Sequence, residues 1–163
     1  MTDMQDHPNI VNLHEIWESP ETCSLVTEFC VGGDLLDFAN KQGLPMHESA
    51  VFTISSQLLR ALKYMHGRGV IHADIKLENV LLPEENSIES LRLIDFGLSY
   101  KKLARDDLLK VTSGTLSYMA PEMLRETQQY DVQCDMWSMG VLIFILATGQ
   151  MPFQGEQTSQ MVQ

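Results

Sequence analysis

The stretch from residue 71 to residue 82 constrains this chain most, because it sets polar side chains at short intervals between two apolar runs. It reads Ile-His-Ala-Asp-Ile-Lys-Leu-Glu-Asn-Val-Leu-Leu. Apolar flanks bury such a segment, so its polar side chains need partners or an open cleft. Asp74 is suited to accept a proton from a hydroxyl, Lys76 to neutralise a phosphate, and Asn79 to offer an oxygen to Mg²⁺.

A second signal follows at residues 93–97, Leu-Ile-Asp-Phe-Gly, which reads as a short strand that ends in a carboxylate and a glycine. Two oxygen ligands at the ends of adjacent strands suit a hard cation that bridges phosphates. Asn79 and Asp95 are therefore the predicted magnesium ligands.

These residues resemble the catalytic loop and the metal-binding loop of protein kinases. The family pattern H-R-D-L-x-x-x-N reads His-Ala-Asp-Ile-Lys-Leu-Glu-Asn here, D-F-G is intact at residues 95–97, and Ala-Pro-Glu follows at 120–122. Three motifs in the family's order favour this resemblance over an ordinary buried strand pair with a solvated turn. The general style of residues 26–43 is similar to calcium/calmodulin-dependent kinases.

The resemblance implies an α+β, protein-kinase-like fold that is truncated at both ends. Residues 1–30 are expected to be the C-terminal remnant of the β-rich small lobe with the hinge, and residues 31–163 a partial, mostly helical large (catalytic) lobe. The implied activity is that of a serine/threonine kinase, a transferase that moves the γ-phosphoryl of ATP to Ser/Thr hydroxyls of a protein substrate, with ATP and Mg²⁺ as cofactors.

The resemblance also assigns catalytic roles. Asp74 matches the residue that accepts the substrate hydroxyl proton, and Lys76 matches the lysine that contacts the transferring phosphate. Thr115 would bridge these two side chains, which is a serine/threonine-kinase feature. Asn79 and Asp95 match the two metal ligands of the family.

Five further residues match the nucleotide-binding cleft of the family. Thr27 corresponds to the gatekeeper at the back of the adenine pocket. Glu28 and Cys30 would offer backbone groups to the adenine edge. Asp34 would lie near the ribose, and Leu81 would form the floor under adenine.

The chain departs from the family in what it lacks. It contains no G-x-G-x-x-G loop and no lysine of the V-A-I-K strand. Because phosphoryl transfer depends on positioning and charge stabilisation, we expect the chain alone to be inactive. The alternatives are a non-catalytic kinase-like binding or scaffold module, or a helical scaffold without a ligand. The apolar helix near residues 136–148 is expected to be partly uncovered.

Ala73 stands where the family motif has an arginine that captures the phosphate on the activation loop. Thr112 and Ser113 are candidate phosphorylation sites by position. Where these residues are phosphorylated, we expect that the side chain of residue 73 does not bind the phosphate.

Local patterns predict the elements. Helices are expected at 34–41, with Asp34 as N-cap, at 48–66, and at 136–148; strands are expected at 10–17, 23–30 and 91–94. His66 is expected as a favourable charge at a helix C-terminus. The family resemblance implies that His72 lies in the core beneath Phe96 rather than acting as a base, and that a buried Asp135 would bond the backbone of the catalytic loop.

Composition limits the partners, the metal sites and the cellular location that we expect. A net charge of −11 argues against a nucleic-acid partner or an anionic membrane surface. Cys23, Cys30 and Cys134 form no CxxC pair, so zinc is not expected and free thiols in a reducing compartment are. The longest apolar run is too short for the roughly 20 residues of a membrane span. An intracellular, cytoplasmic location is expected, with the nucleus left open.

Overall fold

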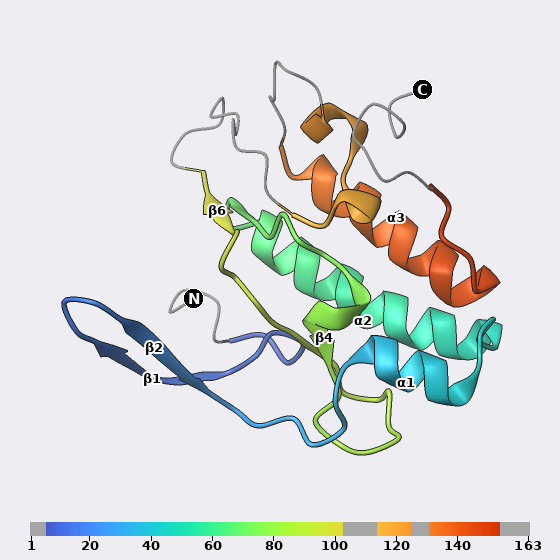
Figure 1. Ribbon diagram of the computed structural model, residues 1–163, viewed down its shortest axis with the longest axis horizontal. Helices are drawn as coiled ribbons and strands as arrows, with labels where there is room; N and C mark the ends of the chain where they lie inside the picture. The colour runs from blue at the N-terminus through green and yellow to red at the C-terminus, as the bar shows by residue number, and fades with distance from the viewer. Residues whose placement is uncertain (1–5, 103–113, 125–130, 154–163) are drawn as a thin grey trace.

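The computed structural model describes residues 6–102, 114–124 and 131–153 of the chain (Figure 1). Within these ranges it contains three α-helices and a few short strands, which agrees with the expected α+β class. A helical body carries most of the described residues, and one two-stranded hairpin projects from its side. No helix among the described residues is long and apolar enough to cross a lipid bilayer.

The first two helices have the bounds that the sequence predicts to within one residue. Helix α1 (Leu35–Gln42) starts after Asp34, whose Oδ1 accepts a hydrogen bond of 2.8 Å from a first-turn backbone N–H. It ends at Gly43, whose φ of 89° lies in the region that favours glycine. Helix α2 (Glu48–His66) buries the stripe of apolar side chains that recurs every three and four residues.

Helix α3 (Gln133–Thr148) begins three residues before the predicted start. Asp135, which the family resemblance puts at the start of this helix, lies in its first turn, where a carboxylate is favourable. Asp135 is in fact buried there. The helix ends at Gly149, which has a φ of 71°.

Strands β1 (Leu13–Glu18) and β2 (Cys23–Thr27) form the predicted antiparallel hairpin, but both are shorter than expected. At the N-terminal end, Val11 N donates a hydrogen bond of 3.0 Å to Leu93 O, so this residue belongs to the helical body instead. At the C-terminal end, the chain leaves the strand at Glu28 and runs towards α1.

The remaining strands are two-residue pairs that hold the loops of the body. They are β3 (Val70–Ile71) with β6 (Tyr100–Lys101), and β4 (Val80–Leu81) with β5 (Arg92–Leu93), all antiparallel. In the described part of the chain, three short 3₁₀ helices accompany them, η2 (Leu77–Asn79), η3 (Leu116–Tyr118) and η4 (Pro121–Leu124). Because Ile94 N donates to Asn79 O at 2.9 Å, the end of η2 and the residue that follows β5 lie side by side.

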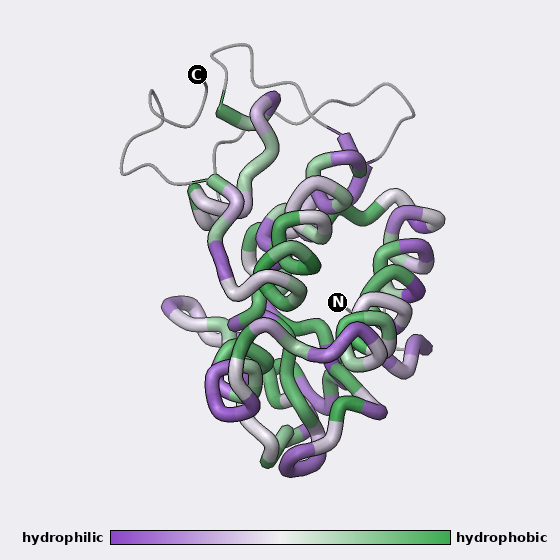
Figure 2. Tube along the Cα trace, turned by 90° about the vertical axis from the view of Figure 1, so that its right-hand side faces the viewer, coloured by the Kyte–Doolittle hydropathy of each residue, from purple (hydrophilic) through white to green (hydrophobic). Residues whose placement is uncertain are grey.

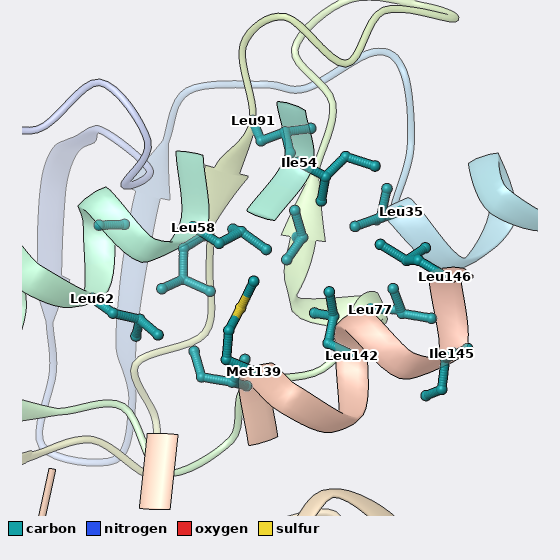
Figure 3. Close-up of a cluster of buried hydrophobic side chains, with 14 of the residues drawn as sticks. Leu35, Ile54, Leu58, Leu62, Leu77, Leu91, Met139, Leu142, Ile145 and Leu146 are labelled. Carbon is teal, nitrogen blue, oxygen red and sulfur yellow. The ribbon is translucent and has the colours of Figure 1, made fainter. Parts of the chain in front are cut away.

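The main core lies where α2, α3 and the short strands meet (Figure 3). Its fully buried side chains include Leu35, Ile54, Leu58, Leu62, Leu77, Leu91, Met139, Leu142 and Leu146. Green, hydrophobic segments gather at the same place in Figure 2, and purple segments lie on outer loops and helix turns. Each such side chain contributes roughly 1.5–3 kcal/mol by leaving water. This core is the rigid support for the loops at residues 72–79 and 94–97.

One face of α3 remains open, as the sequence predicts. Met136 and Phe144 are 46% and 42% exposed, and the rings of Trp137 and Phe153 stack with centroids 5.3 Å apart. The helix is apolar on all sides, so this face is a continuous apolar surface among the described residues.

Candidate active site

Asp74 is the centre of a polar cluster that joins three side chains from two parts of the chain. Its Oδ1 accepts hydrogen bonds of 3.0 Å from both the backbone N–H and the hydroxyl of Thr115. Its Oδ2 lies 2.9 Å from Lys76 Nζ and accepts a bond of 2.9 Å from Asn79 Nδ2. Lys76 Nζ also donates to Thr115 Oγ1 at 2.9 Å. The contacts expected between Thr115 and both partners are therefore present.

The surroundings of Asp74 keep its carboxyl group ionised. Burial alone would raise its pKa, but the hydrogen bonds from Lys76 and Thr115, the Lys76 charge and the Asn79 amide outweigh burial and lower the pKa. The residue is only 7% exposed. A fixed, ionised carboxylate of this kind can orient a hydroxyl group and accept its proton.

Gly114 brings the second segment close enough to make this cluster. A Cβ atom on residue 114 would lie 2.8 Å from Ala73 O, and the φ of Gly114 is 124°. Both the space and the backbone conformation therefore require glycine next to Thr115. Thr112 and Ser113, the candidate phosphorylation sites, lie outside the described residues.

Asp135 holds the backbone of the same loop from beneath. Its Oδ2 accepts a bond of 3.0 Å from His72 N, and its Oδ1 accepts one of 2.9 Å from Ala73 N. Ala73 has a φ of 66°, a left-handed conformation that is uncommon outside glycine. The predicted contact between Asp135 and the loop backbone is thus confirmed, and it secures a strained turn.

His66 also contacts Asp135, and this contact is not predictable from the sequence. Its Nε2 lies 2.7 Å from Asp135 Oδ2, although the two residues are 69 positions apart. The side chain still lies in the last turn of α2, as predicted, but its main polar contact is with α3. Sequence spacing carries no signal for a pair this distant.

His72 is a core residue, as expected. It is fully buried, its ring centroid lies 5.2 Å from that of Phe96, and Asp74 N donates to its Nδ1 at 3.3 Å. The proton is then on Nε2, which donates to Ile94 O at 2.9 Å. Burial lowers the pKa of His72, against the weaker opposite effect of Asp135, so the ring stays neutral.

This buried histidine makes stability depend on pH. Because its folded pKa lies below the ordinary value of about 6.5, the unfolded chain binds the proton first, and the free energy of unfolding should fall as pH drops from about 7.5 to 5.5. His7, whose pKa is lowered by burial and by Arg60 and Arg68, acts in the same direction. The measurement is urea denaturation at a series of pH values.

The control variants separate the contributions. His72→Gln should flatten the pH dependence below 6.5, whereas replacing the exposed His14 by glutamine should leave it unchanged. An equally steep dependence in His72→Gln and in the parent chain would contradict the assignment.

Asn79 and Asp95 each keep a side-chain oxygen free of the bonds that hold the catalytic-loop segment. Asn79 Nδ2 donates to Asp74 O at 2.8 Å as well as to its carboxylate, which leaves the amide oxygen of Asn79 for another partner. Asp95 has a φ of 61°, is exposed, and accepts a bond of 3.1 Å from Gly97 N through Oδ1. No group of three or more His, Cys, Asp or Glu side chains in the described part of the chain could hold a metal. Mg²⁺ needs only one or two protein oxygens where phosphates supply others, so this donor set fits it.

A cavity of about 540 Å³ opens beside Asp95. It is lined by Val11, Leu25, Thr27, Leu81, Ile94, Asp95, Phe96 and Gly97. Apolar walls with a carboxylate at one end suit a flat apolar ring joined to charged groups. Thr27 and Leu81, two of the residues that the resemblance assigns to a nucleotide cleft, line this cavity.

The other predicted nucleotide-binding residues lie just outside the lining of this cavity. The Glu28 carboxylate bonds to Arg92 Nε and to Asn12 N, both at 2.8 Å. The Asp34 carboxylate caps α1, while its backbone forms a bridge to Leu81. Cys30 is buried, and burial and the nearby Glu28 charge raise the pKa of its thiol.

Comparison with known proteins gives one family. The model of the protein kinase domain family matches residues 1–163. Calcium-dependent protein kinase 5 of Plasmodium berghei (strain Anka) and that of Plasmodium falciparum (isolate 3D7) are each 38% identical over 157 residues, which are 96% of this chain and 27% of the relative. Serine/threonine-protein kinase RAD53 of Saccharomyces cerevisiae is 37% identical over 168 residues, with 96% of this chain and 20% of the relative covered. The chain thus spans less than a third of the length of these relatives.

Proposed function

Because the chain belongs to the protein kinase family, we propose that it supplies the catalytic loop, the metal-binding loop and part of the nucleotide cleft of a serine/threonine kinase. The proposed reaction transfers the γ-phosphoryl of ATP to a Ser or Thr hydroxyl of a protein substrate. The observation that carries the proposal is the cluster around Asp74. Thr115, Lys76 and Asn79 all bond to this one carboxylate, from segments 41 residues apart.

The proposed roles follow from the geometry of that cluster. Asp74 orients the substrate hydroxyl and accepts its proton, while the hydroxyl oxygen bonds to the γ-phosphorus and the bond to the β-phosphate oxygen breaks to leave ADP. Lys76 lies next to the carboxylate and neutralises charge on the transferring group. Thr115 holds Asp74 and Lys76 in register through its hydroxyl, which bonds to both.

The nucleotide is proposed to enter the cavity beside Asp95. Its base would lie between Leu81 and Thr27, with Glu28 and Cys30 as neighbours along one edge. Asp34 would be near the ribose, because its backbone pairs with Leu81. Asn79 and Asp95 would hold Mg²⁺, which neutralises the phosphates when it is bound.

The division into lobes remains part of this proposal. Residues 1–30 would come from the small lobe and hinge, and residues 31–163 from the large lobe. The hairpin that projects from the helical body supports this division (Figure 1). Cys23, Cys30 and Cys134 are all free thiols, which supports an intracellular setting.

The second candidate function is nucleotide or partner binding without catalysis. It is favoured by one observation, the exposed apolar face of α3 at Met136 and Phe144, which is the kind of surface that a partner covers. The intact Asp74 cluster favours the kinase instead, because a non-catalytic module does not require a carboxylate that is held by hydrogen bonds next to a lysine.

Calorimetric titration of the chain with Mg·ATP tests the nucleotide site. We expect binding that Asp95→Ala weakens roughly tenfold or more, because that variant removes the proposed carboxylate ligand of the metal. Binding of ATP without Mg²⁺ should be similar in both proteins. Asp37→Ala, which removes an exposed carboxylate of α1, is the matched control and should bind as the parent chain does. No Mg·ATP binding by the folded chain would contradict a competent site in this segment.

A further inference from the structure

The guanidinium of Arg92, on the short strand β5, donates several hydrogen bonds. Its Nε donates a hydrogen bond of 2.8 Å to Glu28 Oε1, and its Nη1 donates to Ser90 Oγ at 2.8 Å and to Pro8 O. The guanidinium therefore connects β5 to two segments that lie far away in the sequence. A planar guanidinium with several bonds is held more firmly than a lysine would be.

Glu28 carries this contact to the base of the hairpin. The oxygen that accepts from Arg92, Oε1, also accepts a bond of 2.8 Å from Asn12 N. In return, Glu28 N donates to Asn12 O at 3.0 Å. Asn12 and Glu28 are the two points at which the chain passes between the helical body and the β1–β2 hairpin (Figure 1). One carboxylate thus ties both crossing points to each other and to the body.

The ion pair between Arg92 and Glu28 is largely shielded from solvent. The side chains of Arg92 and Glu28 are 18% and 22% exposed. A charge-assisted bond in such surroundings is screened less than one on the open surface. The Glu28 charge raises the pKa of the Cys30 thiol and the Arg92 charge lowers it, so both charges also act on the segment that follows Glu28.

The cavity walls begin one residue away from this clamp of Asn12, Glu28 and Arg92. Val11 precedes Asn12, and Thr27 precedes Glu28; both line the cavity beside Asp95. Leu81 on β4, which pairs with Arg92 on β5, lines the same cavity. The clamp therefore joins the lining residues next to the hairpin crossings to the lining residue on β4.

We propose that Arg92 is a positioning residue for the base end of the nucleotide cleft, and that it acts through the carboxylate of Glu28 on the crossings at Asn12 and Glu28. The nucleotide part of this inference rests on the proposed function. The clamp itself rests only on the contacts given above.

Hydrogen exchange and binding together test the proposal. In Arg92→Met we expect the amides of Asn12 and Glu28 to exchange roughly tenfold faster, while amides of the α2 core keep their rates. The affinities for ATP and for adenosine should fall by a similar factor of roughly five, because the base end is affected and the metal end is not. Arg92→Lys should restore part of both effects.

A double-mutant cycle separates a clamp from general destabilisation. Glu28→Gln should reproduce the Arg92→Met effects, and the double variant should be no worse than the more affected single variant. Arg60→Met, which changes an exposed arginine of α2, and Glu18→Gln, which changes an exposed carboxylate of β1, are the matched controls. Multiplying effects in the double variant would overturn the proposal.

The outcomes also distinguish this inference from the proposed function. Unchanged exchange at residues 12 and 28 in Arg92→Met overturns the clamp, whether or not nucleotide binds. Faster exchange in that variant, with no nucleotide bound by the parent chain, leaves the clamp standing and removes the kinase site instead. Uniformly faster exchange throughout the body would mean a purely structural role and would overturn the positioning role.

Discussion

Asp135→Ala is expected to lower the free energy of unfolding by roughly 3–5 kcal/mol, the largest effect on stability that we predict. The variant leaves the buried N–H groups of His72 and Ala73 without an acceptor, and it removes the partner of His66. The left-handed turn at Ala73 also loses its anchor. Because small domains have a total of about 5–15 kcal/mol, the variant should lose a large share of its stability.

Urea denaturation followed by circular dichroism measures this loss. Asp135→Asn keeps one acceptor oxygen and should lose less than the alanine variant. Asp37→Ala, on the exposed side of α1, is the control and should change stability by about 0.5 kcal/mol or less. A loss below about 1 kcal/mol in Asp135→Ala would mean that the loop is held by other contacts.

Asp74→Asn is expected to have the largest effect on catalysis. In a kinase domain completed with a glycine-rich loop and its lysine, the variant should lower kcat by roughly 10²–10⁴-fold, because an amide cannot accept the hydroxyl proton. The KM for ATP should change little, since Asp74 is not among the residues that line the cavity beside Asp95. Steady-state phosphorylation of a Ser/Thr peptide measures both constants.

The amide group of Asp74→Asn would face hydrogen-bond donors, so this variant requires a folding control. Lys76 Nζ and Asn79 Nδ2 both face Oδ2 of Asp74, so an NH₂ group there would oppose two donors. Circular dichroism and Mg·ATP binding should show that the variant is folded before kcat is interpreted. A folded Asp74→Asn protein with kcat within about tenfold of the parent would contradict the role of Asp74.

The parts of the fold that sequence predicts are those with local signals. Helix α2 follows an apolar repeat over its whole length, and α1 carries a cap at Asp34 and a glycine at its end. The Asp74, Lys76 and Asn79 spacing is equally local, so these residues were found from one stretch. The role of Thr115 came only from the family resemblance, because 41 residues separate it from Asp74.

The contacts that sequence could not predict are long-range polar pairs. Asn9 and Gln57 are both buried, and Asn9 Nδ2 donates to Gln57 Oε1 at 2.9 Å across 48 residues. Neither residue has a neighbour that marks it as part of a pair. His66 with Asp135 is a second case. Such pairs depend on how the helices and loops are brought together, which residue spacing does not record.

The base of the hairpin also sets how the hairpin can move. In mechanical terms, a rigid part joined to a body at two points retains one easy rotation, about the line through those points. For the β1–β2 hairpin that line runs through Asn12 and Glu28, which bond to each other. Twisting or sliding of the hairpin against the body would break those bonds. Rotation of the hairpin about the line would keep them. Rotation of the hairpin about this single axis would move Leu25 and Thr27, and it would widen or narrow the cavity that they line.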